Sequence, residues 1–97
     1  MTLAIYIPAY NAERFVTQVL RRIPNSVLAR TAEIVLVDNA STDRTSEVAS
    51  ATAQELGWTN FTLIRNPTNL GYGGSQKVAY AHCIARGHKT VVMLHAD

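Results

Sequence analysis

The sequence has a single cysteine, no long apolar run and no cluster of basic residues, and each absence excludes a class of protein. Cys83 cannot form an internal disulfide, so we expect a protein of a reducing compartment. No apolar segment approaches the roughly 18 residues of a membrane-spanning helix, and the N-terminus lacks a signal-peptide pattern. The sequence therefore predicts a cytoplasmic protein, with any attachment to the cytoplasmic membrane face left to parts outside these residues.

The charge of the chain is low and evenly spread. Nine Lys and Arg residues against seven Asp and Glu residues give a net charge of +2, without a dense basic run. Nucleic-acid binding, which requires a basic patch or stripe, is therefore not expected. The 97 residues are 47% apolar, which suffices for a core, yet the chain is shorter than most domains. We expect residues 1–97 to form one incomplete domain.

Short apolar runs alternate with helical patterns along the chain. Four runs rich in β-branched and apolar side chains predict strands over residues 3–7, 34–37, 61–64 and 90–94. Apolar residues at helical spacing, together with capping residues, predict helices from Asn11 to Ile23, from the Ser41 to Asp43 caps to Leu56, and from Ser75 to Arg86. Pro67 and three glycines predict an irregular loop from Asn66 to Gly74.

This alternation predicts the fold class. Strands that alternate with helices form βαβ units, whose right-handed crossovers give a parallel, Rossmann-like α/β sheet with helices on both faces. If the last strand lies on the other side of the first strand from the second, the strand order reverses there. Ligands bind at the carboxyl ends of the strands beside such a switch point. Polar residues follow those ends: Tyr10, Asn11, Asp38, Asn39 and Asp97.

Asp38 ends an apolar strand, where its carboxylate could accept hydrogen bonds from a base or a ribose. The simpler interpretation is that Asp38 or Asp43 only caps the following helix. One carboxylate is enough for a cap, so the presence of both in one short segment favours a ligand role for Asp38.

The glycine loop could let a ligand approach the backbone at Gly71 and Gly74, and the N-terminus of the following helix favours a phosphate. Lys77, one turn into that helix, could pair with the phosphate, although a solvated lysine is the commoner case. The loop contains no Walker pattern, and it does not follow the first strand as a Rossmann fingerprint does. Turn formation alone is the competing interpretation of these glycines.

His95 and Asp97 lie two residues apart in an extended segment, so their side chains leave the same face and could bind one ion. Asp97 suits a hard divalent cation, and Mg²⁺ is often held by few carboxylates together with substrate phosphates. Mn²⁺ accepts a histidine ligand more readily. Taken alone, the pair could also be a turn with satisfied polar groups, but its place at a strand end favours a Mg²⁺ or Mn²⁺ site.

Four segments in this order resemble glycosyltransferase family 2, which has the GT-A fold: Ile7-Pro8-Ala9-Tyr10-Asn11, Val37-Asp38-Asn39-Ala40-Ser41-Thr42-Asp43, Asn69-Leu70-Gly71-Tyr72-Gly73-Gly74 and His95-Ala96-Asp97. The resemblance covers the whole chain. The continuation of the glycine loop into Ser75-Gln76-Lys77 is most similar to the polyprenyl-phosphate (dolichol-phosphate) mannosyltransferase-like branch.

The resemblance implies an inverting, metal-dependent transfer of a sugar from a UDP- or GDP-sugar to an acceptor, for which a polyprenyl phosphate is one candidate. Asp97 would be the metal carboxylate, with His95 at the first position of the family's Asp-x-Asp motif. Asn39 stands where many relatives carry a second Asp. The expected nucleotide-binding residues are Pro8, Ala9, Tyr10, Asn11, Asp38, Gly71, Gly74 and Lys77. The family's general base lies downstream of the metal motif, so we expect these residues alone to be inactive.

The alternative is a non-catalytic, flavodoxin-like nucleotide-binding or signalling module, which would use the same switch point. A receiver-type module needs an acidic cluster after the first strand, where Tyr10 and Asn11 stand and Glu13 is the nearest acid. A dehydrogenase fragment is the third interpretation, disfavoured because the glycines expected after the first strand are missing.

Overall fold

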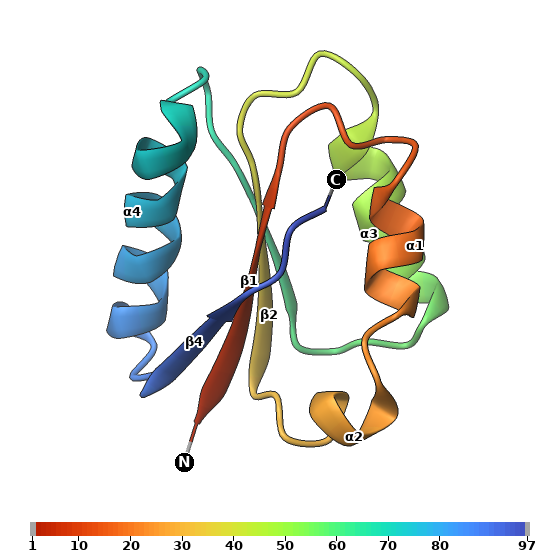
Figure 1. Ribbon diagram of the computed structural model, residues 1–97, viewed down its shortest axis with the longest axis vertical. Helices are drawn as coiled ribbons and strands as arrows, with labels where there is room; N and C mark the ends of the chain where they lie inside the picture. Colours follow the sequence, from red (N-terminus) through yellow and green to blue (C-terminus); the bar gives the residue numbers. More distant parts are fainter. Residues whose placement is uncertain (1, 97) are drawn as a thin grey trace.

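The structure, a computed structural model, describes residues 2–96. Within this range, four parallel strands form one sheet in the order β3-β2-β1-β4, and four helices connect them (Figure 1). The strands are β1 (Leu3–Ala9), β2 (Glu33–Asp38), β3 (Phe61–Arg65) and β4 (Thr90–Met93). The helices are α1 (Val16–Arg21), α2 (Asn25–Leu28), α3 (Thr45–Glu55) and α4 (Gly71–Ala85). The predicted α/β class is confirmed, and the strand order reverses between β1 and β4.

Helices cover both faces of the sheet, with α4 on one face and α1 and α3 on the other (Figure 1). Because side chains alternate along a strand, β1 sends Ile5 and Ile7 toward α1 and α3, and Ala4 and Tyr6 toward α4. The central strands β1 and β2 are therefore buried on both faces, as is usual for a parallel sheet covered by helices. Among the described residues, no helix combines the length and the hydropathy that crossing a membrane requires.

The first predicted helix begins later than expected. Asn11 is not its N-cap, because Asn11 adopts a left-handed backbone conformation with φ of 48° and α1 begins only at Val16. A turn lies between them, closed by hydrogen bonds from the backbone N of Phe15 and of Val16 to the carbonyl of Ala12. The helix also ends at Arg21, and α2 follows directly after Pro24.

The glycine loop is shorter than predicted. Residues Gly71 to Gly74 belong to the first turn of α4 instead of an irregular loop. Gly71 has φ of 75°, a conformation that glycine adopts without steric cost and that turns the chain into the helix. The helix begins at Gly71 because the backbone N of Leu70 donates to Asn39 Oδ1 and the backbone N of Gly71 donates to Asn69 Oδ1, and these contacts outweigh the local preference of glycine for irregular structure.

Candidate functional site

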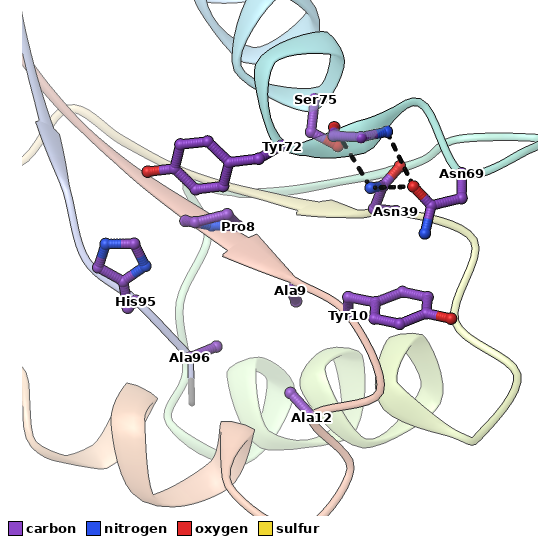
Figure 2. A pocket seen from close by; sticks show the side chains of 11 residues that line it. Pro8, Ala9, Tyr10, Ala12, Asn39, Asn69, Tyr72, Ser75, His95 and Ala96 are labelled. Atoms are coloured by element: carbon purple, nitrogen blue, oxygen red, sulfur yellow. Dashed lines mark hydrogen bonds between the residues drawn. The ribbon is translucent and has the colours of Figure 1, made fainter.

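A cavity of about 400 Å³ lies at the carboxyl ends of β1 and β2, beside the switch point between β1 and β4 (Figure 2). It is formed by the ends of strands and the start of α4, which places it where the sequence predicts a ligand site. The residues that line it are Pro8, Ala9, Tyr10, Ala12, Asn39, Asn69, Gly71, Tyr72, Ser75, His95 and Ala96.

Aromatic side chains flank this cavity. The rings of Tyr72 and His95 stack with a centroid distance of 6.2 Å and an interplanar angle of 14°. Tyr10, which is 51% exposed, lies on the other side of the cavity in the close view (Figure 2). Small side chains, Ala9 and Ala96, lie between them (Figure 2). The cavity thus offers flat apolar surfaces suited to a planar ring, next to polar groups.

Asp38, the last residue of β2, is not among the residues that line this cavity. Its side chain is fully buried and accepts hydrogen bonds from the backbone N of Ser41 at 2.9 Å and from the Ser41 hydroxyl at 2.5 Å. The Ser46 hydroxyl and Arg65 Nη1, the latter at 2.8 Å, donate to its second oxygen. Four donors therefore satisfy the Asp38 carboxylate within the protein.

The helix-capping contact belongs to Asp43. Its Oδ1 accepts a hydrogen bond from the backbone N of Thr45, the first residue of α3, at 3.0 Å. The Thr45 hydroxyl and the backbone N of Glu13 also donate to Asp43. Burial raises the pKa of Asp43, but these hydrogen bonds outweigh it and hold the pKa below its usual value. Asp43 thus holds the start of α3, whereas Asp38 is engaged by its own four donors, none of which is a backbone group of that helix.

The loops after β1 and β2 are joined by side-chain hydrogen bonds. The backbone N of Asn11 donates to Ser41 Oγ at 2.8 Å, and the backbone N of Ala12 donates to Thr45 Oγ1 at 2.8 Å. In return, Asn11 Oδ1 accepts from the backbone N of Thr42 at 2.9 Å. The polar segment after β2 therefore fixes the loop that carries Tyr10.

Asn39 connects the end of β2 to the glycine loop. Its Oδ1 accepts from Asn66 Nδ2 at 3.0 Å and from the backbone N of Leu70 at 2.9 Å. Its Nδ2 donates to Asn69 Oδ1 at 2.9 Å and to the carbonyl of Gly71 at 3.4 Å (Figure 2). This network holds the start of α4 on the cavity wall.

The structure brings only some of the predicted site residues together. The cavity lining includes five of them: Pro8, Ala9, Tyr10, Gly71 and His95. Four others do not line it: Asn11 supports the neighbouring loop, Asp38 is fully buried, Gly74 packs on Leu70, and Lys77 is exposed on the second turn of α4. Asn39, which the sequence places at the end of a strand but not among the nucleotide-binding residues, also lines the cavity. The lining residues that the sequence did not single out are Ala12, Asn69, Tyr72, Ser75 and Ala96.

The predicted metal site falls partly outside the described residues. Asp97 lies outside them, whereas His95 lines the cavity beside Tyr72. Within residues 2–96, no group of three or more His, Cys, Asp or Glu side chains is arranged to hold a metal ion. Of the two predicted ligands, the structure describes only His95. This side chain fits a divalent cation only where further oxygen ligands, such as phosphates, join it.

A second polar cluster lies at the opposite end of β2. Glu33 begins that strand, and its carboxylate lies 2.8 Å from His82 Nε2, 2.7 Å from His88 Nε2 and 2.5 Å from Thr62 Oγ1. Burial of Glu33 raises its pKa, but these hydrogen bonds and the charge of His82 outweigh burial and bring the pKa to about 2. His82 and His88 thus both hydrogen-bond to the Glu33 carboxylate, at the end of β2 away from the cavity.

Two other titratable groups are unsuited to chemistry. Burial raises the pKa of the Cys83 thiol, which is 1% exposed, so the reactive thiolate is disfavoured. Burial, with Tyr72 and Tyr80 nearby, raises the pKa of Tyr6 to about 12. Both side chains belong to the core beneath α4.

Comparison with known proteins gives the chain a family context. The family model of glycosyl transferase family 2 matches residues 4–97. A dolichyl-phosphate beta-glucosyltransferase from Trichomonas vaginalis is 34% identical over 102 residues, which span 98% of the chain and 30% of that protein. An undecaprenyl-phosphate 4-deoxy-4-formamido-L-arabinose transferase from Pseudomonas aeruginosa is 34% identical over 96 residues, 97% of the chain and 27% of that protein. The chain thus spans less than a third of these relatives, and the resemblance to the polyprenyl-phosphate branch is confirmed.

Solved structures share the fold. A mannosyltransferase from Pyrobaculum calidifontis in complex with GDP-Man and Mn²⁺ has a TM-score of 0.71 at 25% identity, over 82% of the chain and 24% of that protein. Glucosyl-3-phosphoglycerate synthase from Mycobacterium tuberculosis, in complex with Mn²⁺, UDP and phosphoglyceric acid, has a TM-score of 0.74 at 22% identity, over 99% of the chain and 33% of that protein. These likenesses assign the GT-A fold to the chain.

Proposed function

The chain belongs to glycosyl transferase family 2, and from this we propose that it forms the donor-binding part of an enzyme that transfers a sugar from a nucleoside diphosphate sugar to an acceptor. Residues 1–97 would be the N-terminal nucleotide-sugar-binding portion of a larger GT-A domain. The small share of the relatives' length that the chain covers supports this assignment.

The observation that carries the proposal is the cavity at the switch point. It combines the strand ends Pro8 and Ala9, the aromatic rings of Tyr10 and Tyr72, and the start of α4 at Gly71. In this proposal the base lies against Tyr10 and the residues after β1. The diphosphate lies toward Gly71, where the positive end of the α4 dipole favours negative charge. Lys77, on the next turn, would add a positively charged side chain near the phosphates. Gly74 would allow the loop to pack closely.

His95 and Asp97 would hold a Mg²⁺ or Mn²⁺ ion together with the diphosphate. The place of His95 on the cavity wall supports this, as do the Mn²⁺ ions and nucleotides named in the related structures. When bound, the cation neutralises the charge of the departing diphosphate. The stack with Tyr72 keeps the His95 ring at the cavity edge.

The transfer is proposed to invert the anomeric configuration, with the general base supplied by a part of the enzyme beyond residue 97. The names of the curated relatives support a polyprenyl phosphate as acceptor, which would bring the reaction to the membrane face. The donor would be a UDP- or GDP-sugar, as the nucleotides in the related structures suggest.

Isothermal titration of the chain with UDP and with GDP, in the presence and absence of Mn²⁺ or Mg²⁺, tests the proposal. We expect binding that metal strengthens, and a loss of about tenfold or more of the metal-dependent part in Asp97→Ala and His95→Ala. Glu55→Ala, which removes a carboxylate at the far end of α3, is the matched control and should bind as the parent does. If the parent and all three variants bind nucleotide with the same affinity in the presence and absence of metal, the non-catalytic module is favoured instead.

A further inference from the structure

We propose that Asn39 is a positioning residue of the cavity, whose side-chain amide fixes Asn69 and Gly71 on the cavity wall and has no group left to bind a ligand. The importance of that wall for donor binding rests on the function proposed above. The fixing of the wall itself is a separate claim and is tested separately.

The Asn39 amide uses its full hydrogen-bonding capacity within the protein. An amide oxygen accepts two hydrogen bonds and an amide nitrogen donates two. Asn39 Oδ1 receives the two from Asn66 and Leu70, and Asn39 Nδ2 gives the two to Asn69 and Gly71. A nucleobase in the cavity would therefore meet an amide whose partners are already taken.

Backbone groups fix which way the amide points. The oxygen and nitrogen of an asparagine are assigned from their partners. The Leu70 partner is a backbone N–H, which can only donate, and the Gly71 partner is a carbonyl, which can only accept. Both contacts therefore require the same orientation of Asn39.

The network continues into buried side chains. Asn66, which is 3% exposed, donates from the same Nδ2 to Asn39 and, at 2.9 Å, to Ser75 Oγ. Asn69 Oδ1 accepts from Asn39 and, at 2.8 Å, from the backbone N of Gly71. Asn39 therefore controls the orientation of Asn69, and Asn69 in turn caps the first residue of α4.

A carboxylate at position 39 would break one half of this arrangement. Aspartate keeps the acceptor that faces Leu70 but replaces the donor with a second acceptor, opposite Asn69 Oδ1 and the Gly71 carbonyl. Asn69 would relieve the repulsion by turning its Nδ2 toward position 39. Its oxygen would then leave the backbone N of Gly71.

Amide hydrogen exchange of the nucleotide-free chain, followed by NMR, tests this prediction residue by residue. In Asn39→Ala we expect the amides of both Leu70 and Gly71 to exchange about tenfold faster, because each loses a hydrogen bond or its support. In Asn39→Asp we expect faster exchange at Gly71 and parent-like exchange at Leu70. A general loosening of α4 would accelerate both amides in both variants and would overturn the proposal.

Asn60→Asp is the matched control, because Asn60 donates to the Thr31 carbonyl at the opposite end of the sheet. It should leave both amides unchanged. A parent-like exchange pattern in Asn39→Ala would also overturn the fixing role.

Titration of Asn39→Ala with UDP and Mn²⁺ separates the two claims. Weaker binding, with the Leu70 and Gly71 amides accelerated, supports the positioning role. Parent-like binding with accelerated amides contradicts it, since loosening the wall would then leave UDP binding unchanged. If the parent binds neither UDP nor GDP, the proposed function fails, while the exchange pattern still decides whether Asn39 fixes the wall.

Discussion

Arg65 reaches from the end of β3 to Asp38 at the end of β2 and donates from Nη1 to Oδ2 over 2.8 Å. The Asp38 side chain is fully buried, whereas the Arg65 side chain is 49% exposed. Arg65 Nη2 also donates to the carbonyl of Ser41 at 2.8 Å. The half-exposed Arg65 thus compensates the buried charge of Asp38 and holds the segment that follows Asp38.

Asp38→Asn should destabilise the fold. An asparagine accepts through one oxygen only, and its amide nitrogen would oppose the donors Ser46 and Arg65. We expect a loss of about 2 to 4 kcal/mol in the free energy of unfolding, measured by urea denaturation. Glu47→Gln, in an exposed pair with Arg44, should change it by less than about 0.5 kcal/mol. A stability equal to that of the parent would mean that the buried contacts of Asp38 contribute nothing.

The same variant tests the predicted nucleoside contact of Asp38. Under conditions where Asp38→Asn remains folded, its affinity for UDP and GDP is compared with that of the parent. If Asp38 only supports the loop, the variant should lose a modest amount of affinity for both nucleotides, because Asp38 holds Ser41 and Ser41 holds the loop after β1. Unchanged affinity for both would contradict a nucleoside role.

The position of Asn11 predicts an order of stabilities. Asn11 combines a left-handed backbone, with φ of 48°, and a hydrogen bond from the backbone N of Thr42 at 2.9 Å. Asn11→Gly keeps the backbone preference and loses only the hydrogen bond, whereas Asn11→Ala loses both. We expect a destabilisation of about 1 kcal/mol for glycine and about 2 for alanine, from thermal unfolding. The reverse order would show that the backbone conformation of residue 11 is not strained.

The fold could be predicted because its signals are repeated along the chain. Continuous apolar runs such as Ile34 to Val37 indicate strands buried on both faces, and the alternation with helices indicates a parallel sheet. Boundaries were predicted less well where contacts distant in sequence override local preference. Asn11 is a good cap by residue type, yet Ser41 and Thr42 hold it in a different conformation.

The site could be predicted only in part, for a similar reason. Strand ends mark Pro8, Ala9 and Tyr10, and all of them line the cavity. Whether a polar side chain faces the cavity or the interior depends on partners that sequence spacing does not reveal. Asp38 meets Arg65, which is 27 residues away, and turns inward, while its neighbour Asn39 reaches the cavity.

Glu33 makes the stability of the protein depend on pH. Its pKa is lowered from 4.5 to about 2: burial raises it, and hydrogen bonds from Thr62, His82 and His88 lower it more strongly. The folded state therefore binds this proton less readily than the unfolded state. The contribution is fully present above the unfolded pKa of 4.5 and is lost as the pH falls toward 2.

Urea denaturation of the parent and of Glu33→Gln between about pH 6 and pH 2.5 measures this contribution. We expect the difference between the two proteins to shrink by up to roughly 3 kcal/mol across that range. Thr62→Val removes one donor, at 2.5 Å, and should shift the loss toward higher pH. Parallel curves for the parent and Glu33→Gln would contradict the lowered pKa.

Two adjacent glycines at the start of α4 provide a matched pair of variants. A Cβ added at Gly74 would lie 2.7 Å from the Cβ of Leu70, whereas a Cβ added at Gly73 meets nothing within 4 Å. Both residues are helical, where alanine is preferred over glycine. Gly73→Ala should therefore stabilise the protein by about 0.5 to 1 kcal/mol.

Gly74→Ala should instead destabilise it by about 1 to 3 kcal/mol, because Leu70 has to move. Leu70 donates its backbone N to Asn39, so the displacement should also reach the cavity wall and weaken UDP binding. Thermal unfolding and nucleotide titration of the two variants, side by side, measure both effects. Equal behaviour of Gly73→Ala and Gly74→Ala would show that contact with Leu70 does not restrict position 74. Loss of stability in Gly74→Ala without loss of UDP binding would show that a displacement at the start of α4 does not affect the cavity.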